Sequence, residues 1–227
     1  MFNIQRETMK KIILFIAALI IILAGSGVAA YQFLNQNNTL RVACVGDSLT
    51  QSTEYPYDLW NMLGNQTYEL RNFGAGSTTV NLASETPYMN TTVYQEALAF
   101  QPNIVIIMLG TNDAQPSLIP YNATFVADYV TLIRAFQALP TNPKIWIVLP
   151  PPIFSSQEGK MNPEYFQTTI IPDIQQAANI TGCPTINVNS ALQGHPEYST
   201  DGVHINPAGA KVIADTIYAA ITPSLKK

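Results

Sequence analysis

The run Ile104–Met108 constrains the fold more than any other segment, because its five consecutive residues (IVIIM) are all apolar and show no alternation with polar residues. Such a run predicts a strand that is buried on both faces, as in a parallel sheet covered by helices. Four further apolar runs predict the other strands, over Leu40–Val45, Tyr68–Asn72, Ile145–Leu149 and Thr185–Val188. The chain is therefore expected to contain a five-stranded parallel sheet.

Helical patterns separate these runs. Apolar side chains recur on one helical face between Val126 and Phe136, and again between Val212 and Ile221. Asn206 and Pro207 precede the second pattern, as expected for an N-cap and a proline in the first turn. Strands that alternate with helices predict a three-layer α/β domain, whose ligands bind beyond the carboxyl ends of the strands.

The N-terminal segment differs from the rest of the chain. Residues 12–30 carry no charge, whereas Arg6, Lys10 and Lys11 precede them. As a helix these nineteen residues span about 28 Å, close to the hydrocarbon thickness of a bilayer. We expect residues 1–30 to form a cytoplasmic tip and a membrane anchor, 31–39 a tether, and 40–227 a folded domain outside the cell. The alternative is a signal peptide, cleaved after the small residues near Ala30, and a secreted domain.

The composition excludes several classes of function. The 227 residues include 11 Lys and Arg against 15 Asp and Glu, and no basic cluster, so nucleic acid is not an expected partner. There are two histidines, and the set Asp201, His204 and His195 has too few ligands for a metal site. We therefore expect neither a metal nor a cofactor. The sequence does not indicate an oligomeric state.

Polar residues follow four of the predicted strands, and each of these segments taken alone is also an ordinary turn or cap. The carboxyl ends of parallel strands meet at one edge of a sheet, so we expect the four segments to lie together there. The segments are Gly46–Thr50, Phe73–Gly76, Gly110–Asp113 and Asp201–His204.

Together these residues could catalyse acyl transfer. A serine hydroxyl needs a base to act as a nucleophile, and we expect Ser48 to be activated by His204, with Asp201 orienting the imidazole. The oxyanion of the transition state needs hydrogen-bond donors, and three are expected: the N–H groups of Ser48 and Gly74 and the side-chain amide of Asn112. His195 is a rival base; we interpret it as a rim residue.

The four segments resemble the sequence blocks of the SGNH (GDSL-type) hydrolase family. Gly46–Leu49 is similar to its first block, Asn72–Gly74 to its second, Gly110–Asp113 to its third and Asp201–His204 to its last. The resemblance extends over residues 40–221. It implies a flavodoxin-like fold with strand order 2-1-3-4-5, a shallow open site and ester hydrolysis without a metal. It also implies supporting roles for Asp47 and Asp113.

The implied strand order bears on the two cysteines. It puts Cys44 on the first strand and Cys183 just before the fifth, some 14 Å apart at sheet spacing. A disulfide requires Cα atoms within about 7 Å of each other. We therefore expect two buried thiols and no disulfide between them.

The expected substrate class rests on two further sequence segments and on the lengths of the loops. The segments around Pro150–Phe154 and Ile170–Pro172 are similar to family members that act on O-acetylated sugars, and no insertion is long enough to form a lid over a long acyl chain. Tyr55, Tyr57 and Tyr198 could stack on sugar rings. We expect a short-chain (acetyl-type) esterase acting on a small-molecule or glycan ester outside the cell. The alternatives are a lysophospholipase or thioesterase, and a non-catalytic surface module that binds glycans.

Overall fold

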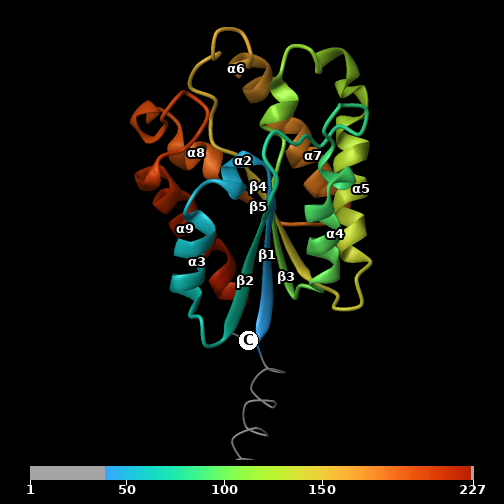
Figure 1. Ribbon diagram of the computed structural model, residues 1–227, viewed down its shortest axis with the longest axis vertical. Coiled ribbons are helices and arrows are strands. Elements are labelled where there is room, and N and C mark those ends of the chain that lie inside the picture. The colour runs from blue at the N-terminus through green and yellow to red at the C-terminus, as the bar shows by residue number, and fades with distance from the viewer. Residues whose placement is uncertain (1–38, 226–227) are drawn as a thin grey trace, which may run out of the picture. The chain divides into compact units, whose positions relative to one another are not determined.

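The computed structural model describes residues 39–225, and the chain divides into the units Met1–Thr39 and Leu40–Lys227. The fold described below is that of the second unit (Figure 1). The predicted anchor or signal segment, and all of the predicted tether except Thr39, lie outside the described residues. Within residues 39–225, no helix combines the length and the apolar character that crossing a membrane requires.

The sheet has five parallel strands in the order β2-β1-β3-β4-β5, which confirms the predicted topology. The register pairs Gly46 with Gly74 across the first two strands, so both of these strands end at the same level. The last strand ends one residue before its predicted end, because Val188 begins a helix. The strands are β1 (Leu40–Gly46), β2 (Tyr68–Gly74), β3 (Ile104–Met108), β4 (Lys144–Leu149) and β5 (Thr185–Asn187).

Helices cover both faces of the sheet (Figure 1). Helices α3 and α9 pack together on one face, and α5 and α7 pack together on the other, alongside α4. The α-helices described are α2 (Ser48–Gln51), α3 (Tyr55–Leu63), α4 (Thr92–Ala99), α5 (Phe125–Gln137), α6 (Pro163–Tyr165), α7 (Ile171–Thr181), α8 (Val188–Leu192) and α9 (Pro207–Ile221).

Each face of the sheet has its own hydrophobic core, since successive strand residues point to opposite sides. Val105 and Ile107 of β3 belong to the core beneath α4, α5 and α7, whereas Ile104 and Ile106 belong to the core beneath α3 and α9. Every residue of β3 is at most 2% exposed. The prediction of a strand buried on both faces is therefore confirmed.

The predicted start of the last helix is also confirmed, because the Asn206 side chain accepts a hydrogen bond from the Gly209 N–H at 3.0 Å. Both cysteines are free and buried, as expected. Burial raises the pKa of the Cys44 thiol to about 12, so this thiol stays protonated at neutral pH.

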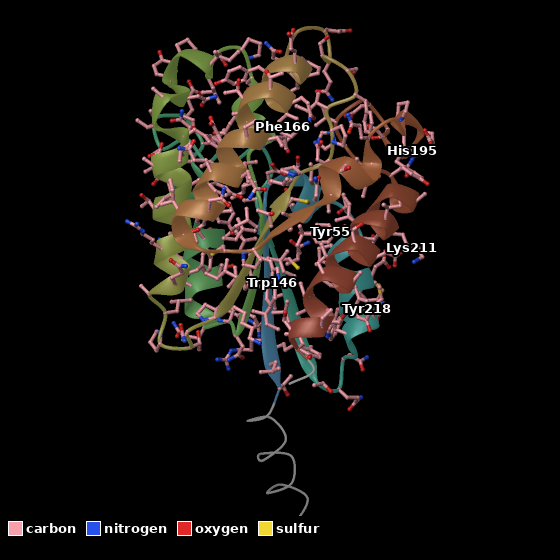
Figure 2. The ribbon with its side chains drawn as sticks, turned by 180° about the vertical axis from the view of Figure 1, so that it is seen from behind. Tyr55, Trp146, Phe166, His195, Lys211 and Tyr218 are labelled. Atoms are coloured by element: carbon pink, nitrogen blue, oxygen red, sulfur yellow. The ribbon has the colours of Figure 1, made fainter. Side chains whose placement is uncertain are left out.

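A helical stretch that the sequence did not predict in this form runs from Pro163 to Thr181. It consists of α6, a π-helical turn over Phe166–Ile170, and α7. Pro172 has no N–H for the helical ladder, and a wider turn just before it accommodates this loss. Phe166, labelled in Figure 2, and Ile170 are fully buried in this stretch. Ile170 lies beside Gly110, so the stretch also supports the loop that follows β3.

Candidate active site

Ser48, His204 and Asp201 lie within hydrogen-bond reach of one another at the carboxyl edge of the sheet. Ser48 is the first residue of α2, directly after β1, and its Oγ lies 3.2 Å from Nε2 of His204. Nδ1 of the same ring lies 2.7 Å from Oδ2 of Asp201. The structure thus brings together three residues that come from opposite ends of the domain sequence.

The loop that carries the histidine is held by its own aspartate. Oδ1 of Asp201 accepts hydrogen bonds from the N–H groups of Val203 at 2.9 Å and His204 at 2.7 Å. Burial alone would raise the pKa of Asp201, but the hydrogen bonds from His204 and Val203 outweigh it and lower the pKa to about 2. Asp201 is therefore a carboxylate at neutral pH and can only accept, which keeps the proton on Nδ1 of His204. Nε2 is then free to accept the proton of Ser48.

The turn that presents Ser48 depends on its neighbours in the sequence. Asp47 is fully buried and caps α2, with its Oδ1 accepting from the Leu49 N–H at 2.9 Å. Gly46 has no room for a side chain, because a Cβ there would lie 2.7 Å from the carbonyl oxygen of Met108. Burial raises the pKa of Asp47 to about 7. This geometry matches the supporting role that the family resemblance implies for Asp47.

Asn112 and Asp113 tie the loop after β3 to the loop after β2. Nδ2 of Asn112 donates to the carbonyl oxygen of Thr78 at 2.9 Å, and its second hydrogen remains available. The buried Asp113 accepts from the N–H groups of Val80 at 3.0 Å and Asn81 at 2.9 Å. Burial raises the pKa of Asp113 to about 6, although these two hydrogen bonds oppose the shift.

Gly74 occupies a different environment from the one expected for an oxyanion donor. It is buried, and its N–H donates to Oδ1 of Asn72 at 2.9 Å. A Cβ at this position would collide with the backbone of α2 at Gln51, so close packing of β2 against α2 accounts for the glycine. The sequence motif alone could not distinguish this packing role from a donor role.

His195 lies in the loop between α8 and α9, as Figure 2 shows. Its Nδ1 lies 2.8 Å from Oε1 of Glu197, and its ring lies against Tyr198 with the centroids 5.5 Å apart. It therefore has a carboxylate partner of its own, but the imidazole that contacts Ser48 is that of His204. Among residues 39–225, no group of three or more His, Cys, Asp or Glu side chains is arranged to hold a metal ion.

The three tyrosines proposed to stack on sugars have different exposures. Tyr55 is fully buried and its hydroxyl lies 2.9 Å from Oγ1 of Thr50, so the expectation that it could stack on a sugar ring is wrong. The apolar pattern of α3 turns this residue into the core. Tyr198 is half-buried against the core beneath α3 and α9. Tyr57, on the outer side of α3, is 57% exposed, and of these three tyrosines it is the one available to a ligand.

Two open cavities are lined by residues that follow the carboxyl ends of β1, β2 and β3. The first, about 400 Å³, lies between α2, α3 and the end of β2, where Gln51, Tyr57, Trp60 and Asn72 line it. The second, about 370 Å³, lies beside Thr79 and Gln115, with Tyr121 in its wall.

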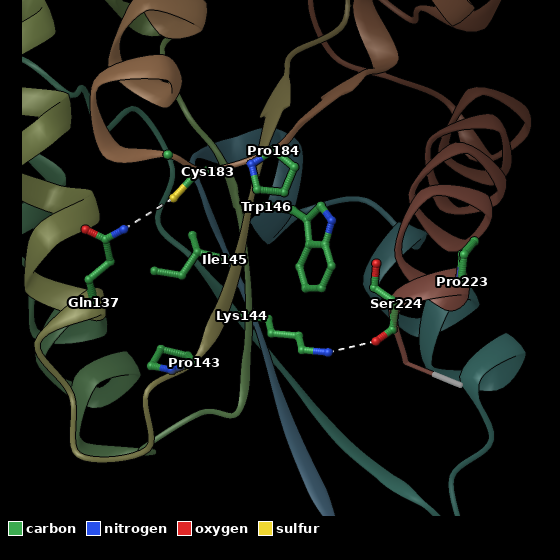
Figure 3. A pocket seen from close by; sticks show the side chains of 10 residues that line it. Gln137, Pro143, Lys144, Ile145, Trp146, Cys183, Pro184, Pro223 and Ser224 are labelled. Carbon is green, nitrogen blue, oxygen red and sulfur yellow. Dashed lines mark hydrogen bonds between the residues drawn. The ribbon is translucent and has the colours of Figure 1, made fainter. Parts of the chain in front are cut away.

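A further cavity, about 520 Å³, lies at the opposite end of the sheet, where β4 begins (Figure 3). Its polar side chains are bound within the protein: Nζ of Lys144 donates to the carbonyl oxygen of Ser224 at 2.7 Å, and Nε2 of Gln137 donates to Thr181 at 2.9 Å. This cavity is remote from Ser48, because β1 carries Ser48 at its carboxyl end and Lys144 is the first residue of β4.

Solved structures of other proteins share this fold. A lipase/acylhydrolase from Enterococcus faecalis superposes with a TM-score of 0.70 at 18% identity, over 82% of this chain and 97% of that one. A carbohydrate acetylesterase family member from Sinorhizobium meliloti gives a TM-score of 0.65 at 18% identity, over 83% and 100% of the two chains. At these identities the likeness is one of fold.

Sequence comparison shows the family directly. The chain is 32% identical over 212 residues to an acetylxylan esterase from Xylanibacter ruminicola, and the match covers 82% of this chain. It spans only 44% of that relative's length. The model of the GDSL-like lipase/acylhydrolase family matches residues 44–212, a span that includes all four sequence blocks. The chain therefore belongs to the GDSL-like lipase/acylhydrolase family.

Proposed function

We propose that this protein is a serine esterase that removes acetyl groups from carbohydrates through an acyl-enzyme intermediate. The observation that carries the proposal is the continuous hydrogen-bonded chain from Ser48 Oγ through His204 to Asp201, at 3.2 and 2.7 Å. A nucleophile, a base and an orienting carboxylate in this arrangement are the parts that ester hydrolysis requires. The name of the acetylxylan esterase relative supports the choice of an acetylated carbohydrate.

The first half-reaction forms the acyl-enzyme. Ser48 Oγ attacks the carbonyl carbon of the acetyl ester while Nε2 of His204 takes the hydroxyl proton. Asp201 stabilises the imidazolium that forms, which its pKa of about 2 allows because it stays ionised. The tetrahedral intermediate then expels the sugar oxygen, which receives the proton from His204. The products of this step are acetyl-Ser48 and the free sugar hydroxyl.

The second half-reaction releases acetate. His204 removes a proton from a water molecule, whose oxygen attacks the acetyl carbon of the acyl-enzyme. The second tetrahedral intermediate collapses, and Ser48 Oγ regains its proton from the imidazolium. In both steps the carbonyl oxygen becomes negative and needs donors fixed in advance. The N–H of Ser48 and the free hydrogen of Asn112 Nδ2 fill this role in our proposal. The N–H of Gly74, the third donor expected, is bonded to Oδ1 of Asn72 at 2.9 Å.

The cavity next to α2 offers a place for the sugar. Tyr57 and Trp60 lie with ring centroids 6.4 Å apart, and the side chain of Gln51 lines the same cavity. Aromatic faces beside an amide donor suit a saccharide, which has apolar ring faces and a rim of hydroxyl groups. Gln51 is one helical turn from Ser48, so a sugar bound here would carry its ester toward the nucleophile.

We also propose, from the sequence alone, that the enzyme works outside the cell and is held at the membrane by its N-terminal segment. Positive charges at Arg6, Lys10 and Lys11 before the uncharged residues 12–30 support this orientation. Secretion after signal cleavage is the competing outcome.

A substrate panel tests the proposed activity. We expect kcat/KM to be highest on p-nitrophenyl acetate or butyrate, to fall steadily toward palmitate, and acetate to be released from acetylated xylooligosaccharides. A long-chain enzyme would show the opposite trend, because each buried methylene contributes about 0.8 kcal/mol. Rising activity with chain length, or faster turnover of lysophospholipid or acyl thioester, would favour the lipid-acting alternatives.

Ser48→Ala is the matched control for that panel. Its hydrolysis of every ester should drop to background while its thermal unfolding stays close to that of the wild type. Saccharide binding without hydrolysis by the wild type would instead favour the non-catalytic glycan-binding module.

A further inference from the structure

Residues Asp201–His204, which we call the base loop, have few hydrogen bonds to the rest of the domain. Most of their hydrogen bonds stay within the segment between α8 and α9, so these bonds set the shape of the loop and not its place above the sheet. Within residues 39–225, the hydrogen bonds that leave this segment from the base loop have three partners: Ser48, Phe154 and Ser155. The contact with Ser48 belongs to the reaction itself, so the polar support of the base loop comes from the other two.

Both supporting residues lie in the loop that follows β4, and they bind successive carbonyl groups of the base loop. The N–H of Phe154 donates to the carbonyl oxygen of Gly202 at 2.7 Å. The hydroxyl of Ser155 donates to the carbonyl oxygen of Asp201 at 3.2 Å. The Ser155 hydroxyl is therefore a side-chain group, open to mutation, that holds the backbone of the residue that orients the imidazole.

Gly202 allows Ser155 to approach the base loop this closely. A Cβ at position 202 would lie 2.7 Å from Cβ of Ser155 and 3.1 Å from its backbone nitrogen, so a side chain has no room there. The φ of Gly202 is also positive, at 94°, which glycine adopts without strain. The two loops therefore meet directly at this point, through both packing and a hydrogen bond.

A residue can hold a neighbouring loop only if its own backbone is fixed, and Ser155 meets this condition although it is exposed. Ile153 before it and Met161 after it are each 7% exposed and belong to the same hydrophobic core as Val203 of the base loop. The N–H of Met161 also donates to the carbonyl oxygen of Ser156 at 3.0 Å, which closes the loop behind Ser155. The loop after β4 is thus anchored on both sides of the contact.

We propose that Ser155 is a positioning residue, whose hydroxyl holds the base loop so that the imidazole of His204 stays directed at Ser48. The inference rests on the proposed esterase function and refines it. Ser155 acts through Asp201: its hydroxyl binds the carbonyl group, and Oδ2 of the same aspartate lies 2.7 Å from Nδ1 of His204. A shift of this backbone is therefore passed to the ring, and it alters the 3.2 Å separation across which Ser48 gives up its proton.

Three single variants of the full chain test the proposal. Ser155→Ala removes the hydroxyl, and Ser155→Thr keeps it. Ser156→Ala is the matched control, because Ser156 is the next residue, is also exposed, and its hydroxyl has no hydrogen-bond partner in the part of the chain that the structure describes. Steady-state hydrolysis of p-nitrophenyl acetate and thermal unfolding are measured for each. A third measurement is the rate of inactivation by diisopropyl fluorophosphate, in which Ser48 Oγ forms a bond to phosphorus and fluoride leaves.

We expect Ser155→Ala to lower kcat by about tenfold, since misplacing a catalytic group by about 1 Å can cost about 10²-fold and the Phe154 hydrogen bond remains. KM should change little, because Ser155 does not touch the substrate. Inactivation by diisopropyl fluorophosphate should slow by a similar factor, since it depends on the same base. The melting temperature should stay close to that of the wild type, because an exposed hydrogen bond contributes little to stability. Ser155→Thr should recover most of the lost rate, and Ser156→Ala should match the wild type.

Several results would contradict the positioning role. Equal losses of kcat in Ser155→Ala and Ser155→Thr would assign the effect to packing against Gly202 and not to the hydroxyl. A rise in KM at unchanged kcat would make Ser155 a substrate-binding residue. A wild type without esterase activity would overturn the proposed function as well, whereas an active wild type with an unimpaired Ser155→Ala variant would overturn this inference alone.

Discussion

Two histidines in the segment between α8 and α9 each have a carboxylate partner, but only His204 contacts Ser48. We expect His204→Ala to lower kcat by several orders of magnitude, and the double variant with Ser48→Ala to be no worse than either single change, because the two side chains act as a unit. His195→Ala should leave kcat nearly unchanged, since its partner is Glu197 at 2.8 Å. Steady-state kinetics on p-nitrophenyl acetate would show it. If His195→Ala alone abolished turnover, the base would have been misassigned.

The buried Asp47 makes a pH dependence of stability predictable. Its pKa is raised to about 7 by burial, whereas an aspartate in the unfolded chain titrates near 4. Between about pH 4 and pH 7 the folded state therefore holds a proton that the unfolded state has released, and the free energy of unfolding falls as the pH rises through this window. Asp113, with a pKa of about 6, acts in the same direction. The lowered pKa of Asp201 acts in the opposite direction, but below this window.

Asp47→Asn tests this dependence, because the amide oxygen can still accept from the Leu49 N–H while the side chain no longer titrates. The melting temperature of the variant minus that of the wild type should be more positive at pH 8 than at pH 4. The melting temperature of the variant should also change less between these two pH values than that of the wild type. Thermal denaturation at pH 4, 6 and 8 would measure this. A constant difference between the two proteins across the series would show that Asp47 does not titrate in this range.

Some residues of the site could be predicted from the sequence, and others could not. The spacing of Asp201 and His204 was enough to anticipate that one loop carries both, since a side chain can bond to N–H groups two and three residues ahead. The environment of Gly74 was not predictable, because it depends on how closely β2 approaches α2. Ser77, in the loop after β2, has a left-handed backbone with φ at 61°, and this was not predictable either, because a serine does not indicate that conformation as a glycine does.

At the scale of elements, α3 turns Tyr55 into the core and Tyr57 outward. If Tyr57 stacks on a sugar, Tyr57→Ala should raise KM for acetylated xylooligosaccharides several-fold and leave kinetics on p-nitrophenyl acetate unchanged, since the small ester does not reach the aromatic side chain. Tyr121→Ala is the matched comparison, because Tyr121 is also 57% exposed but lines the cavity beside Thr79 and Gln115. A larger effect at Tyr121 would move the saccharide to that cavity.

Elements with a complete local signal were predictable, and those governed by tertiary contacts were not. Helix α9 has its N-cap, its proline and an apolar face in one continuous segment, so its start was read correctly. The π-helical turn before Pro172 was not, because proline in a helical pattern predicts a break or a kink. Burial of Phe166 and Ile170 in the core keeps the helical stretch continuous across this turn. That burial depends on tertiary packing, which the local sequence does not indicate.

At the scale of the whole molecule, the parallel sheet followed from hydrophobic pattern, because a strand buried on both faces admits few other architectures. The family resemblance then supplied the strand order. The cavities lined by Tyr57 and by Tyr121 could not be anticipated, since their walls combine segments far apart in the sequence, such as those that carry Thr79 and Gln115.

The membrane anchor that we propose concerns the full chain. The uncharged residues 12–30 are long enough to span a bilayer, and the cations Arg6, Lys10 and Lys11 on one side would keep the N-terminus in the cytoplasm. We expect the full chain to stay with membranes through high-salt and carbonate washes, which remove proteins held by charge alone. A protease added outside intact cells should release an active domain, and residues 31–227 expressed alone should hydrolyse p-nitrophenyl acetate without membranes. Recovery of a soluble native protein that begins near Ala29 or Tyr31 would instead identify residues 1–30 as a cleaved signal peptide.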